Sequence, residues 1–185
     1  MNAALGLSSL LFVPGNRSER FAKALASAAD MVCIDLEDSV PAKDKAAARG
    51  AALAAITGGE RRLGLRINAL TTKAGLEDLL APAGAPTMPA ALLLPMVQSV
   101  SEIDILASVQ GDRTPPLVPL IETVEGLEAA GGIAGSPHVA ALMFGGGDFA
   151  AQLGVALTWD PLLLARGLLI MACAKAGVPA IDVPY

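Results

Sequence analysis

Short apolar runs recur along the whole chain, and each is followed by a longer, alanine-rich stretch. The apolar runs are unbroken rather than alternating with polar residues, which is typical of strands in a parallel sheet covered on both faces. We predict strands at Leu10–Pro14, Met31–Leu36, Leu63–Asn68, Ala91–Met96, Leu117–Glu122, Val139–Phe144 and Val178–Asp182. We predict helices near Ser18–Ala29, Lys43–Ile56, Gly75–Leu80, Ser99–Val109, Gly126–Ala134 and Pro161–Lys175.

This regular alternation predicts an α/β fold, and a (β/α) barrel rather than an open sheet. The sequence supplies seven such strands, and the last predicted strand ends three residues before Tyr185. A closed (β/α)8 barrel has about 250 residues. We therefore expect residues 1–185 to form a single barrel domain that is truncated after its seventh strand.

Composition excludes several classes of partner. The formal net charge is −5, so neither nucleic acid nor an anionic membrane is expected as the main partner. Hydrophobic residues make up 54% of the chain, but no run reaches the ~18 unbroken apolar residues of a membrane-spanning helix. We expect a cytoplasmic protein. Cys33 and Cys173 lie in apolar surroundings and are predicted to be buried thiols rather than a disulfide.

Polar residues gather where the predicted strands end, which is where barrel enzymes place their sites. Glu122 ends the fifth predicted strand, and Asp148 follows the sixth. Two carboxylates on neighbouring strand ends can share one divalent cation, and ligands that are all oxygen favour Mg2+ or Mn2+ over zinc. The alternative is that each carboxylate only caps the helix that follows it.

Three consecutive glycines, Gly145-Gly146-Gly147, stand directly before Asp148. Glycine loses more conformational freedom on folding than any other residue, so such a run is plausible where bare backbone approaches a ligand. The backbone N–H groups suit an anion, and the adjacent carboxylate suits a metal ion. We interpret this segment as a turn that binds a metal-chelated carboxylate.

Arg66 lies in an otherwise apolar strand, and a buried charge without a partner is very costly. Asp35, Glu37 and Asp38 could form a structural ion pair with it. Arg66 could instead face a developing enolate or carboxylate oxygen. Both roles are compatible, because a neighbouring carboxylate can orient the guanidinium. Alternatively, these three carboxylates are only solvated charges at the start of a helix.

The sequence argues against a catalytic or metal-ligating histidine. His138 is the only histidine, and it stands at the start of the sixth predicted strand, at the end away from the expected site. A Ser-His-Asp or Cys-His arrangement within one chain, or a histidine-ligated zinc site, is therefore not expected. Near the first strand, Gly15-Asn16-Arg17 and Lys23 form a modest basic patch that could contact phosphates or simply face solvent.

Motifs along the chain resemble those of the citrate lyase β-subunit-like proteins, in the acyl-CoA lyase branch of the HpcH/HpaI aldolase family. The resemblance covers nearly the whole chain, with the motifs in the same order. They are Leu11-Phe12-Val13-Pro14-Gly15, Asp35-Leu36-Glu37-Asp38-Ser39-Val40-Pro41 with Lys45 and Arg49, Leu65-Arg66-Ile67-Asn68, Leu94-Pro95, Ile121-Glu122-Thr123, Phe144-Gly145-Gly146-Gly147-Asp148 and Ala180-Ile181-Asp182.

The resemblance implies a TIM barrel of the phosphoenolpyruvate/pyruvate superfamily. It also implies a Mg2+-dependent carbon–carbon lyase, which cleaves a citryl-, malyl- or citramalyl-CoA type of thioester into an acetyl thioester and a keto acid through an enolate. The thioester carrier would be CoA or an acyl-carrier protein. The alternatives are an aldolase that acts on free small keto acids and a non-catalytic subunit of a larger lyase assembly.

The same resemblance implies roles for single residues. Glu122 and Asp148 would bind the metal, and the N–H groups of Gly146, Gly147 and Asp148 would hold the carboxylate of the keto acid. Arg66 would stabilise the enolate, and Glu37 and Asp38 are further candidates for the catalytic group.

The chain departs from the family pattern at Met96, where lysine usually follows the proline. The family also continues for about 80 to 100 residues more, judged from the usual barrel size. That part contains the eighth strand and a lid segment that closes over a neighbouring subunit. The resemblance therefore implies a homo-oligomer, a trimer or a hexamer.

Overall fold

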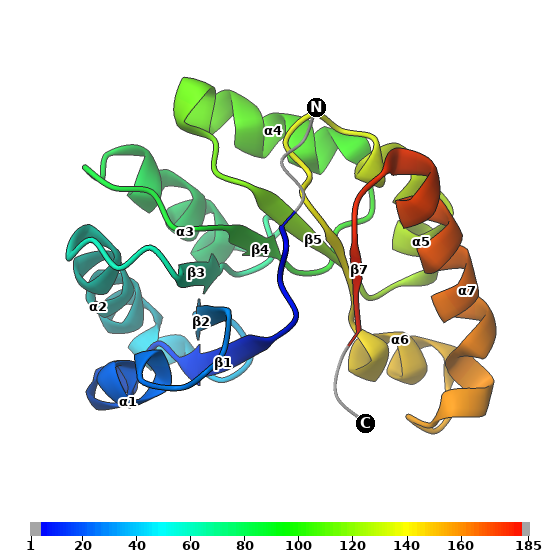
Figure 1. Cartoon of the computed structure of the whole chain (residues 1–185), viewed down its shortest axis with the longest axis horizontal. Helices are drawn as coiled ribbons and strands as arrows, with labels where there is room; N and C mark the ends of the chain where they lie inside the picture. The colour runs from blue at the N-terminus through cyan, green and yellow to red at the C-terminus, as the bar shows by residue number, and fades with distance from the viewer. Residues whose placement is uncertain (1–4, 183–185) are drawn as a thin grey trace. The chain divides into compact units, whose positions relative to one another are not determined.

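The computed structural model describes residues 5–182, and these form two compact units. The Arg66 unit comprises residues 6–93 and 108–115, and the Glu122 unit comprises residue 5 together with 94–107 and 116–182. Strands and helices alternate in both units (Figure 1). The prediction that residues 1–185 form one barrel domain stays a prediction.

All seven predicted strands are present in the described residues. They are β1 (Leu10–Pro14), β2 (Met31–Asp35), β3 (Leu63–Arg66), β4 (Leu92–Leu94), β5 (Leu117–Ile121), β6 (Leu142–Phe144) and β7 (Ala180–Ile181). The α-helices are α1 (Phe21–Leu25), α2 (Lys45–Thr57), α3 (Lys73–Ala83), α4 (Val100–Gln110), α5 (Val124–Ala134), α6 (Gly146–Leu153) and α7 (Trp159–Ala176). Short 3-10 turns η1 (Ser18–Arg20), η2 (Ala42–Asp44) and η3 (Gly111–Arg113) complete the set.

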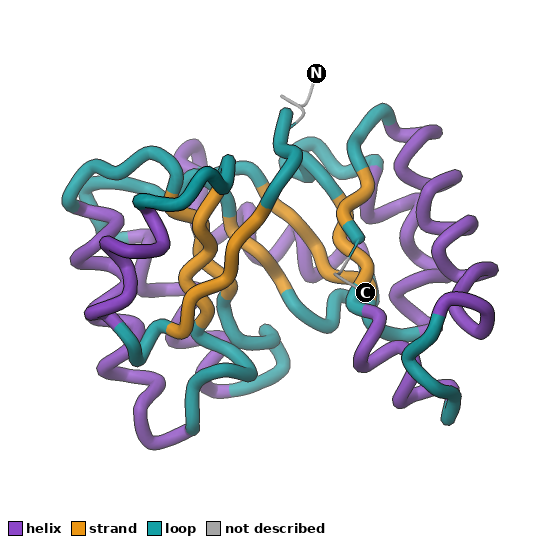
Figure 2. Tube along the Cα trace, turned by 60° about the horizontal axis from the view of Figure 1, so that its bottom comes forward, coloured by secondary structure: helices purple, strands orange, loops and turns teal. Residues whose placement is uncertain are grey.

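Strand pairing is parallel in both units and follows the order of the chain. In the Arg66 unit β1 pairs with β2, β2 with β3 and β3 with β4. In the Glu122 unit β5 pairs with β6, and β6 with β7. Every residue of β2 and β5 is buried, as expected for parallel strands that are covered on both faces. Helices flank the strands of each unit (Figure 2).

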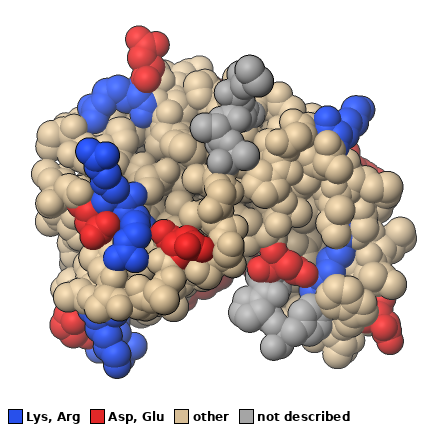
Figure 3. Space-filling model, viewed as in Figure 1, with Lys and Arg blue, Asp and Glu red and all other residues tan. Residues whose placement is uncertain are grey.

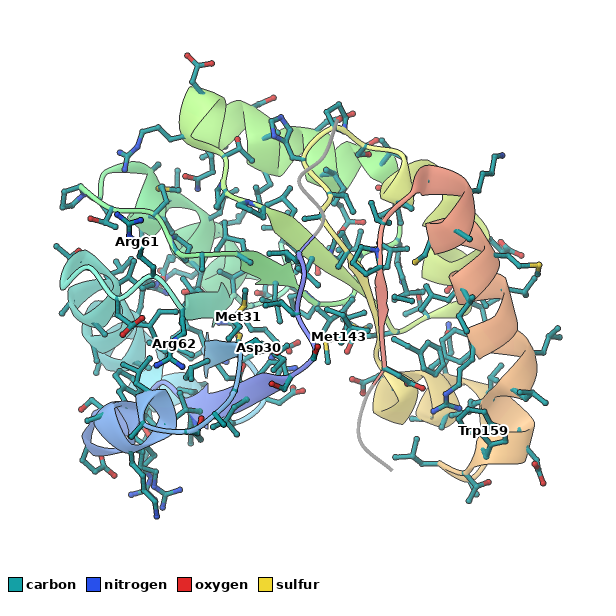
Figure 4. All side chains as sticks on the ribbon, viewed as in Figure 1. Asp30, Met31, Arg61, Arg62, Met143 and Trp159 are labelled. Carbon is teal, nitrogen blue, oxygen red and sulfur yellow. The ribbon has the colours of Figure 1, made fainter. Side chains whose placement is uncertain are left out.

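The register of the first strand pair is fixed by Asp30, which is labelled in Figure 4. Its Oδ2 accepts hydrogen bonds from the backbone N–H of Ser8 and of Ser9, both at 2.8 Å, and from the Ser9 hydroxyl at 3.1 Å. These bonds, led by the one from Ser8, lower the pKa of the Asp30 carboxyl. They hold the start of β1 beside the start of β2, where Leu10 is the partner of Met31.

Helices α3 and α5 begin with the same device, a threonine cap followed three residues later by a glycine. Thr123 Oγ1 accepts a hydrogen bond from the Gly126 N–H at 3.0 Å, and Thr72 caps Gly75 in the same way. A Cβ atom on Gly126 would lie 2.4 Å from the carbonyl oxygen of Val97. The start of α5 therefore packs against the loop that follows β4 more closely than any residue with a side chain permits.

Differences from the predicted elements lie at the strand ends. The structure ends β3, β4 and β5 before Asn68, Met96 and Glu122, so these three residues occupy the connections after the strands. The glycine run, interpreted from the sequence as a turn, forms the start of a helix instead, because Gly146 is the first residue of α6. Sequence periodicity missed this helix because two of its first three residues are glycine.

The structure also bears on the state of the cysteines and on membrane-spanning helices. Cys33 and Cys173 are both buried and free, as predicted. Within residues 5–182, no helix is long and apolar enough to cross a membrane.

The close contact at Gly126 generates a stability prediction. Gly126→Ala forces a methyl group against the Val97 carbonyl and should lower the free energy of unfolding by about 1–3 kcal/mol. Gly131→Ala is the matched control on the same helix, because its Cβ would meet no atom within 4 Å. That substitution should be neutral or stabilise by up to about 1 kcal/mol through helix propensity. Urea unfolding measures both, and equal effects of the two substitutions would contradict the packing argument.

Candidate functional site

Glu122 follows β5 directly, and its residue surface is only 5% exposed. Its Oε2 accepts a hydrogen bond of 2.7 Å from the backbone N–H of Met96. Met96 has a φ of 57°, the only positive φ of a non-glycine residue in the described chain. A non-glycine residue in the left-handed region carries strain on the order of 1–3 kcal/mol, which is typical of functional sites. The strained backbone of Met96 therefore accompanies a hydrogen bond to the buried carboxylate.

Gly145 lies directly against the Glu122 side chain. A Cβ atom on Gly145 would be 2.1 Å from Glu122 Cγ and 2.4 Å from its Oε1. The Gly145 N–H donates a hydrogen bond of 3.0 Å to the carbonyl of Ile121, which extends the pairing of β5 and β6. Gly145 also precedes α6 as its N-cap residue. The Glu122 carboxylate is therefore beside the start of α6, and it can be there only because residue 145 has no side chain.

The first turn of α6 consists of Gly146, Gly147 and Asp148. The N–H of Phe149, bonded to the Gly145 carbonyl at 3.2 Å, starts the helical pattern, and the Gly145 cap supplies no side-chain hydrogen bond. The N–H groups at the start of a helix have no partner within the helix and carry partial positive charge. Gly147 and Asp148 are exposed, so this helix end is accessible to an anion.

A divalent cation fits this donor set. Glu122 and Asp148 supply only carboxylate oxygens, and Mg2+ is commonly held by one or two carboxylates, with waters and substrate oxygens completing its shell. In the described part of the chain, no group of three or more His, Cys, Asp and Glu side chains is placed to hold a metal. Such a cation would therefore take its remaining ligands from solvent or substrate. The metal role of Glu122 and Asp148 stays a prediction.

Arg66, the last residue of β3, is paired with Asp35 across the β2–β3 ladder. Its Nε and Nη2 donate hydrogen bonds of 2.7 and 2.8 Å to the two oxygens of the Asp35 carboxylate. Its Nη1 lies 2.9 Å from Glu37 Oε2, and its guanidinium carbon is 5.1 Å from the centre of the Phe12 ring. Asp38 lies farther away, at 3.7 Å, with a side chain that is 69% exposed. The ion pair expected from the sequence is confirmed, while catalytic roles for Arg66, Glu37 and Asp38 stay predictions.

The charge state of this pair follows from its surroundings. Burial alone would raise the pKa of the Asp35 carboxyl, but the hydrogen bond and charge of Arg66, with bonds from Ser39 and the Glu37 N–H, lower it below its ordinary value. Burial works against the charge of Arg66, yet Asp35, Glu37 and Asp38 together raise the pKa of its guanidinium. Both groups are therefore charged throughout the neutral range, and Arg66 is a fixed cation.

A cavity of about 460 Å3 lies beside the connection after β1. Its polar lining comes from Asn16, Arg17, Ser18 and Asp44, and alanines of α2 form its floor. Asn16 Oδ1 is buried and has no hydrogen-bond partner among the described residues. Lys23, the other member of the predicted basic patch, does not line this cavity. Basic and acidic side chains lie next to one another on the visible surface of each unit, so no broad basic patch is present on that face (Figure 3).

Sequence reasoning missed the surroundings of Arg166. This residue is 4% exposed, and its guanidinium lies 5.0 Å from the rings of both Phe144 and Trp159, the second of which is labelled in Figure 4. Its Nε donates a hydrogen bond of 2.8 Å to Asp182. The strand-end carboxylate of Asp182 is thus engaged by Arg166. A single arginine in the otherwise apolar stretch 162–174 was the available signal.

The parallel strands, of which β1 to β6 are each followed by a helix, and the carboxylates at strand ends define a class of α/β proteins with sites at the carboxyl ends of the strands. Within this class, the sequence profile of the HpcH/HpaI aldolase/citrate lyase family matches residues 8–185, and the chain belongs to that family.

Curated relatives and solved structures agree with this assignment. The chain is 32% identical over 182 residues to (3S)-malyl-CoA thioesterase of Cereibacter sphaeroides, a match that covers 96% of this chain and 62% of the relative. It is 34% identical to L-malyl-CoA/beta-methylmalyl-CoA lyase of the same organism, with 95% and 65% covered. The chain thus spans less than two thirds of the length of these relatives.

Among solved structures, RipC from Yersinia pestis matches with a TM-score of 0.84 and 40% identity, over 97% of this chain and 77% of that one. CitE from Mycobacterium tuberculosis, solved in complex with magnesium, acetoacetate and coenzyme A, matches with a TM-score of 0.80 and 32% identity, over 96% and 66%. These similarities and the seven parallel strands confirm the predicted fold class, a TIM-barrel type of α/β fold.

The lowered pKa of Asp35 predicts how stability depends on pH. Its ion pair contributes fully above the ordinary aspartate pKa of about 4, and the contribution is lost as the pH falls through the lowered folded-state pKa. Asp35→Asn should therefore lower the free energy of unfolding by about 3 kcal/mol at pH 7, because it leaves Arg66 without its main partner. The difference from wild type should shrink below pH ~4.

Urea unfolding at a series of pH values measures this difference. Asp38→Asn is the control, since that carboxylate is mostly exposed and 3.7 Å from Arg66. A stability difference between Asp35→Asn and wild type that stays constant down to pH ~3 would show that the ion pair is not its cause.

Proposed function

We propose that this chain carries the catalytic groups of a Mg2+-dependent carbon–carbon lyase that cleaves a 3-hydroxyacyl-CoA thioester of the malyl-, citramalyl- or citryl-CoA type. The main support is the start of α6, where the buried Glu122 carboxylate lies against Gly145 and the exposed Asp148 follows two glycines. Membership of the HpcH/HpaI aldolase/citrate lyase family and similarity to a malyl-CoA/beta-methylmalyl-CoA lyase support the reaction class.

Glu122 and Asp148 would hold the metal, which as a Lewis acid polarises the oxygen that becomes the keto group. The start of α6 would hold the carboxylate of the keto acid through the N–H groups of Gly146, Gly147 and Asp148, because these groups point along the positive end of the helix dipole. The two carboxylates would thus bind the metal cation, and the N–H groups would bind the carboxylate of the keto acid that the metal chelates. A CitE structure with magnesium and acetoacetate supports this choice of metal and ligand class.

In the cleavage step, the hydroxyl on the 3-carbon loses its proton and becomes the carbonyl of the keto acid. The bond between the 2- and 3-carbons breaks, and its electron pair forms the enolate of the acetyl thioester, which then takes up a proton. The fixed positive charge of Arg66 would stabilise that enolate. Its bonds to Asp35 hold the guanidinium in place, so no reorganisation is needed as the charge develops.

The CoA carrier would occupy the cavity beside the connection after β1. Arg17 lines this cavity with a side chain that is 56% exposed, so it can reach a phosphate, and its ion pair with Glu19 is long at 3.9 Å. The alanine floor suits a flat apolar group, and the buried Asn16 Oδ1 offers an acceptor. We propose a homo-oligomer as the working form; exposed apolar side chains on α7, such as Leu164 and Met171, support it.

Thioester hydrolysis is the second candidate function, and the similarity to a (3S)-malyl-CoA thioesterase favours it. The two reactions differ in their products. A lyase releases glyoxylate and acetyl-CoA from malyl-CoA without a free thiol, whereas a thioesterase releases malate and free CoA. Trapping the keto acid as a hydrazone and measuring the thiol separately therefore distinguishes them. An aldolase on free keto acids would act without any thioester.

The metal assignment predicts a large effect of two substitutions. Glu122→Gln and Asp148→Asn should each lower keto-acid release from malyl- or citramalyl-CoA by about 100-fold or more, because a bound metal contributes several kcal/mol to transition-state stabilisation. Glu125→Gln is the control, since Glu125 is exposed and bonds Gln152 instead. Thermal shift with Mg2+ and pyruvate should show protection of the wild type that both site variants lose. Wild-type protein that releases no keto acid, or site variants that match the control, would contradict the proposal.

The carrier assignment predicts a charge-dependent effect on CoA binding. Arg17→Gln should weaken the Kd for CoA several-fold and reduce its dependence on salt, because a phosphate contact is lost. Arg20→Gln, a nearby exposed arginine outside the cavity lining, should leave the Kd within twofold. Isothermal titration at two salt concentrations measures both, and equal weakening by the two variants would place CoA elsewhere.

A further inference from the structure

Lys45, Asn68, Asp78 and Arg49 form a chain of hydrogen-bonded polar side chains, of which Asn68 and Asp78 are buried, and the proposed function does not use it. Lys45, at the start of α2, donates from its Nζ to the carbonyls of Leu36 and Glu37 at 2.9 and 3.0 Å and to Asn68 Oδ1 at 2.5 Å. An ammonium group has three N–H donors, so these bonds use all of them. Lys45 therefore holds the backbone at Leu36 and Glu37, next to the carboxylates of Asp35 and Glu37 that bind Arg66.

Asn68 connects this lysine to a buried carboxylate. Its Nδ2 donates to the Leu36 carbonyl at 3.0 Å and to Asp78 Oδ2 at 2.6 Å, and its backbone N–H also donates to Asp78 Oδ2, at 2.9 Å. Asn68 is 5% exposed and Asp78 is 1% exposed. An amide in these bonds has a fixed orientation, with its oxygen toward Lys45 and its nitrogen toward Asp78.

Arg49 completes the chain by donating from its Nε to Asp78 Oδ1 at 2.6 Å. Burial works against the charge of Arg49, but Asp78 and Glu77 raise the pKa of its guanidinium. Both oxygens of the Asp78 carboxylate are thus bonded, one to a cation and one to Asn68. The buried charge of Asp78 is compensated, and its direction is set.

The bonds converge on the two strand ends that carry the ion pair of Arg66. Asn68 stands two residues after Arg66, and the Leu36 N–H donates to the Arg66 carbonyl at 2.9 Å. The two carbonyls that Lys45 bonds belong to Leu36 and Glu37. The carboxylate of Glu37 lies 2.9 Å from Arg66 Nη1. Moving Asn68 or Lys45 would therefore shift the Glu37 carboxylate against the guanidinium.

We infer that Asp78 is a positioning residue, which acts through Asn68 and Lys45 to hold Glu37 and Arg66 in register. This inference rests on the proposed function in one respect, namely that the fixed direction of the Arg66 charge matters for stabilising the enolate. Asp78 touches neither Arg66 nor Glu37 in any described bond, so its effect on them passes through the side chains of Asn68 and Lys45.

The chain offers a matched control beside Asp78. Glu77 also bonds Arg49, through Nη2 at 2.9 Å, but its side chain is 45% exposed and has no bond to Asn68. Asp78→Asn and Glu77→Gln therefore remove the same charge from Arg49, while only the first disturbs Asn68. A comparison of the two separates positioning from the general loss of an ion pair.

The experiment has two readouts on the intact chain. The first is 15N NMR of the Arg66 Nε–H, which reports how fast the guanidinium rotates and exchanges its protons, and the second is kcat and KM for malyl-CoA. Asp78→Asn should speed exchange of the Arg66 signal at least threefold and lower kcat about tenfold with KM within twofold, because the lost interaction acts on the transition state. Glu77→Gln should leave both readouts within twofold of wild type.

If Asp78→Asn does not fold, Lys45→Gln provides the same comparison, since Lys45 is only half-buried and the glutamine amide keeps two of the three N–H donors. A folded Asp78→Asn or Lys45→Gln protein with wild-type Arg66 exchange and wild-type kcat overturns the inference, as do equal effects of Asp78→Asn and Glu77→Gln. If wild type releases no keto acid while Arg66 exchange still rises in Asp78→Asn, the proposed function fails and the positioning role of Asp78 remains.

Discussion

Burial of the parallel strands on both faces is the constraint on which the rest of the structure depends. Every residue of β2 and β5 is buried, so a charged side chain within these strands is costly unless another group in contact with it compensates the charge. The carboxyl end of a strand is the first place where a charge can meet other polar groups. Asp35, Arg66 and Glu122 all stand at such ends, and each is held by a specific contact.

These contacts compensate charge in two different ways. Asp35 receives a guanidinium, whose positive charge offsets its own and lowers its pKa, so this carboxylate is a structural anion. Glu122 accepts a hydrogen bond from the backbone N–H of Met96, which orients the carboxylate. In the proposed function the Glu122 carboxylate binds a cation, and the strain at Met96 is a folding cost that fits such a binding role better than a purely structural one.

The sequence allowed the strands, their parallel arrangement and an ion pair of Arg66 with Asp35, Glu37 or Asp38 to be predicted, because unbroken apolar runs and a lone arginine are local signals. It did not reveal the left-handed backbone of Met96, whose N–H bonds the carboxylate of Glu122 at the end of another strand, 26 residues away. The bonds of Asn68 to Asp78 were also hidden, because they join α3 to the end of β3 across ten residues with no periodic pattern. Helix α6 was missed because glycine is a poor helix former, and here helix-breaking residues begin a helix.

Gly145 and Gly147 differ in the physical reason for the glycine, and only that of Gly145 concerns folding. Gly145 is required because Glu122 occupies the space of its missing side chain. At Gly147 a Cβ atom would meet nothing within 4 Å, and the residue is exposed in the first turn of α6. An alanine there would favour the helix by about 1 kcal/mol. Folding therefore does not explain a glycine at 147, whereas the proposed approach of a ligand to the backbone N–H groups at the start of α6 would explain it.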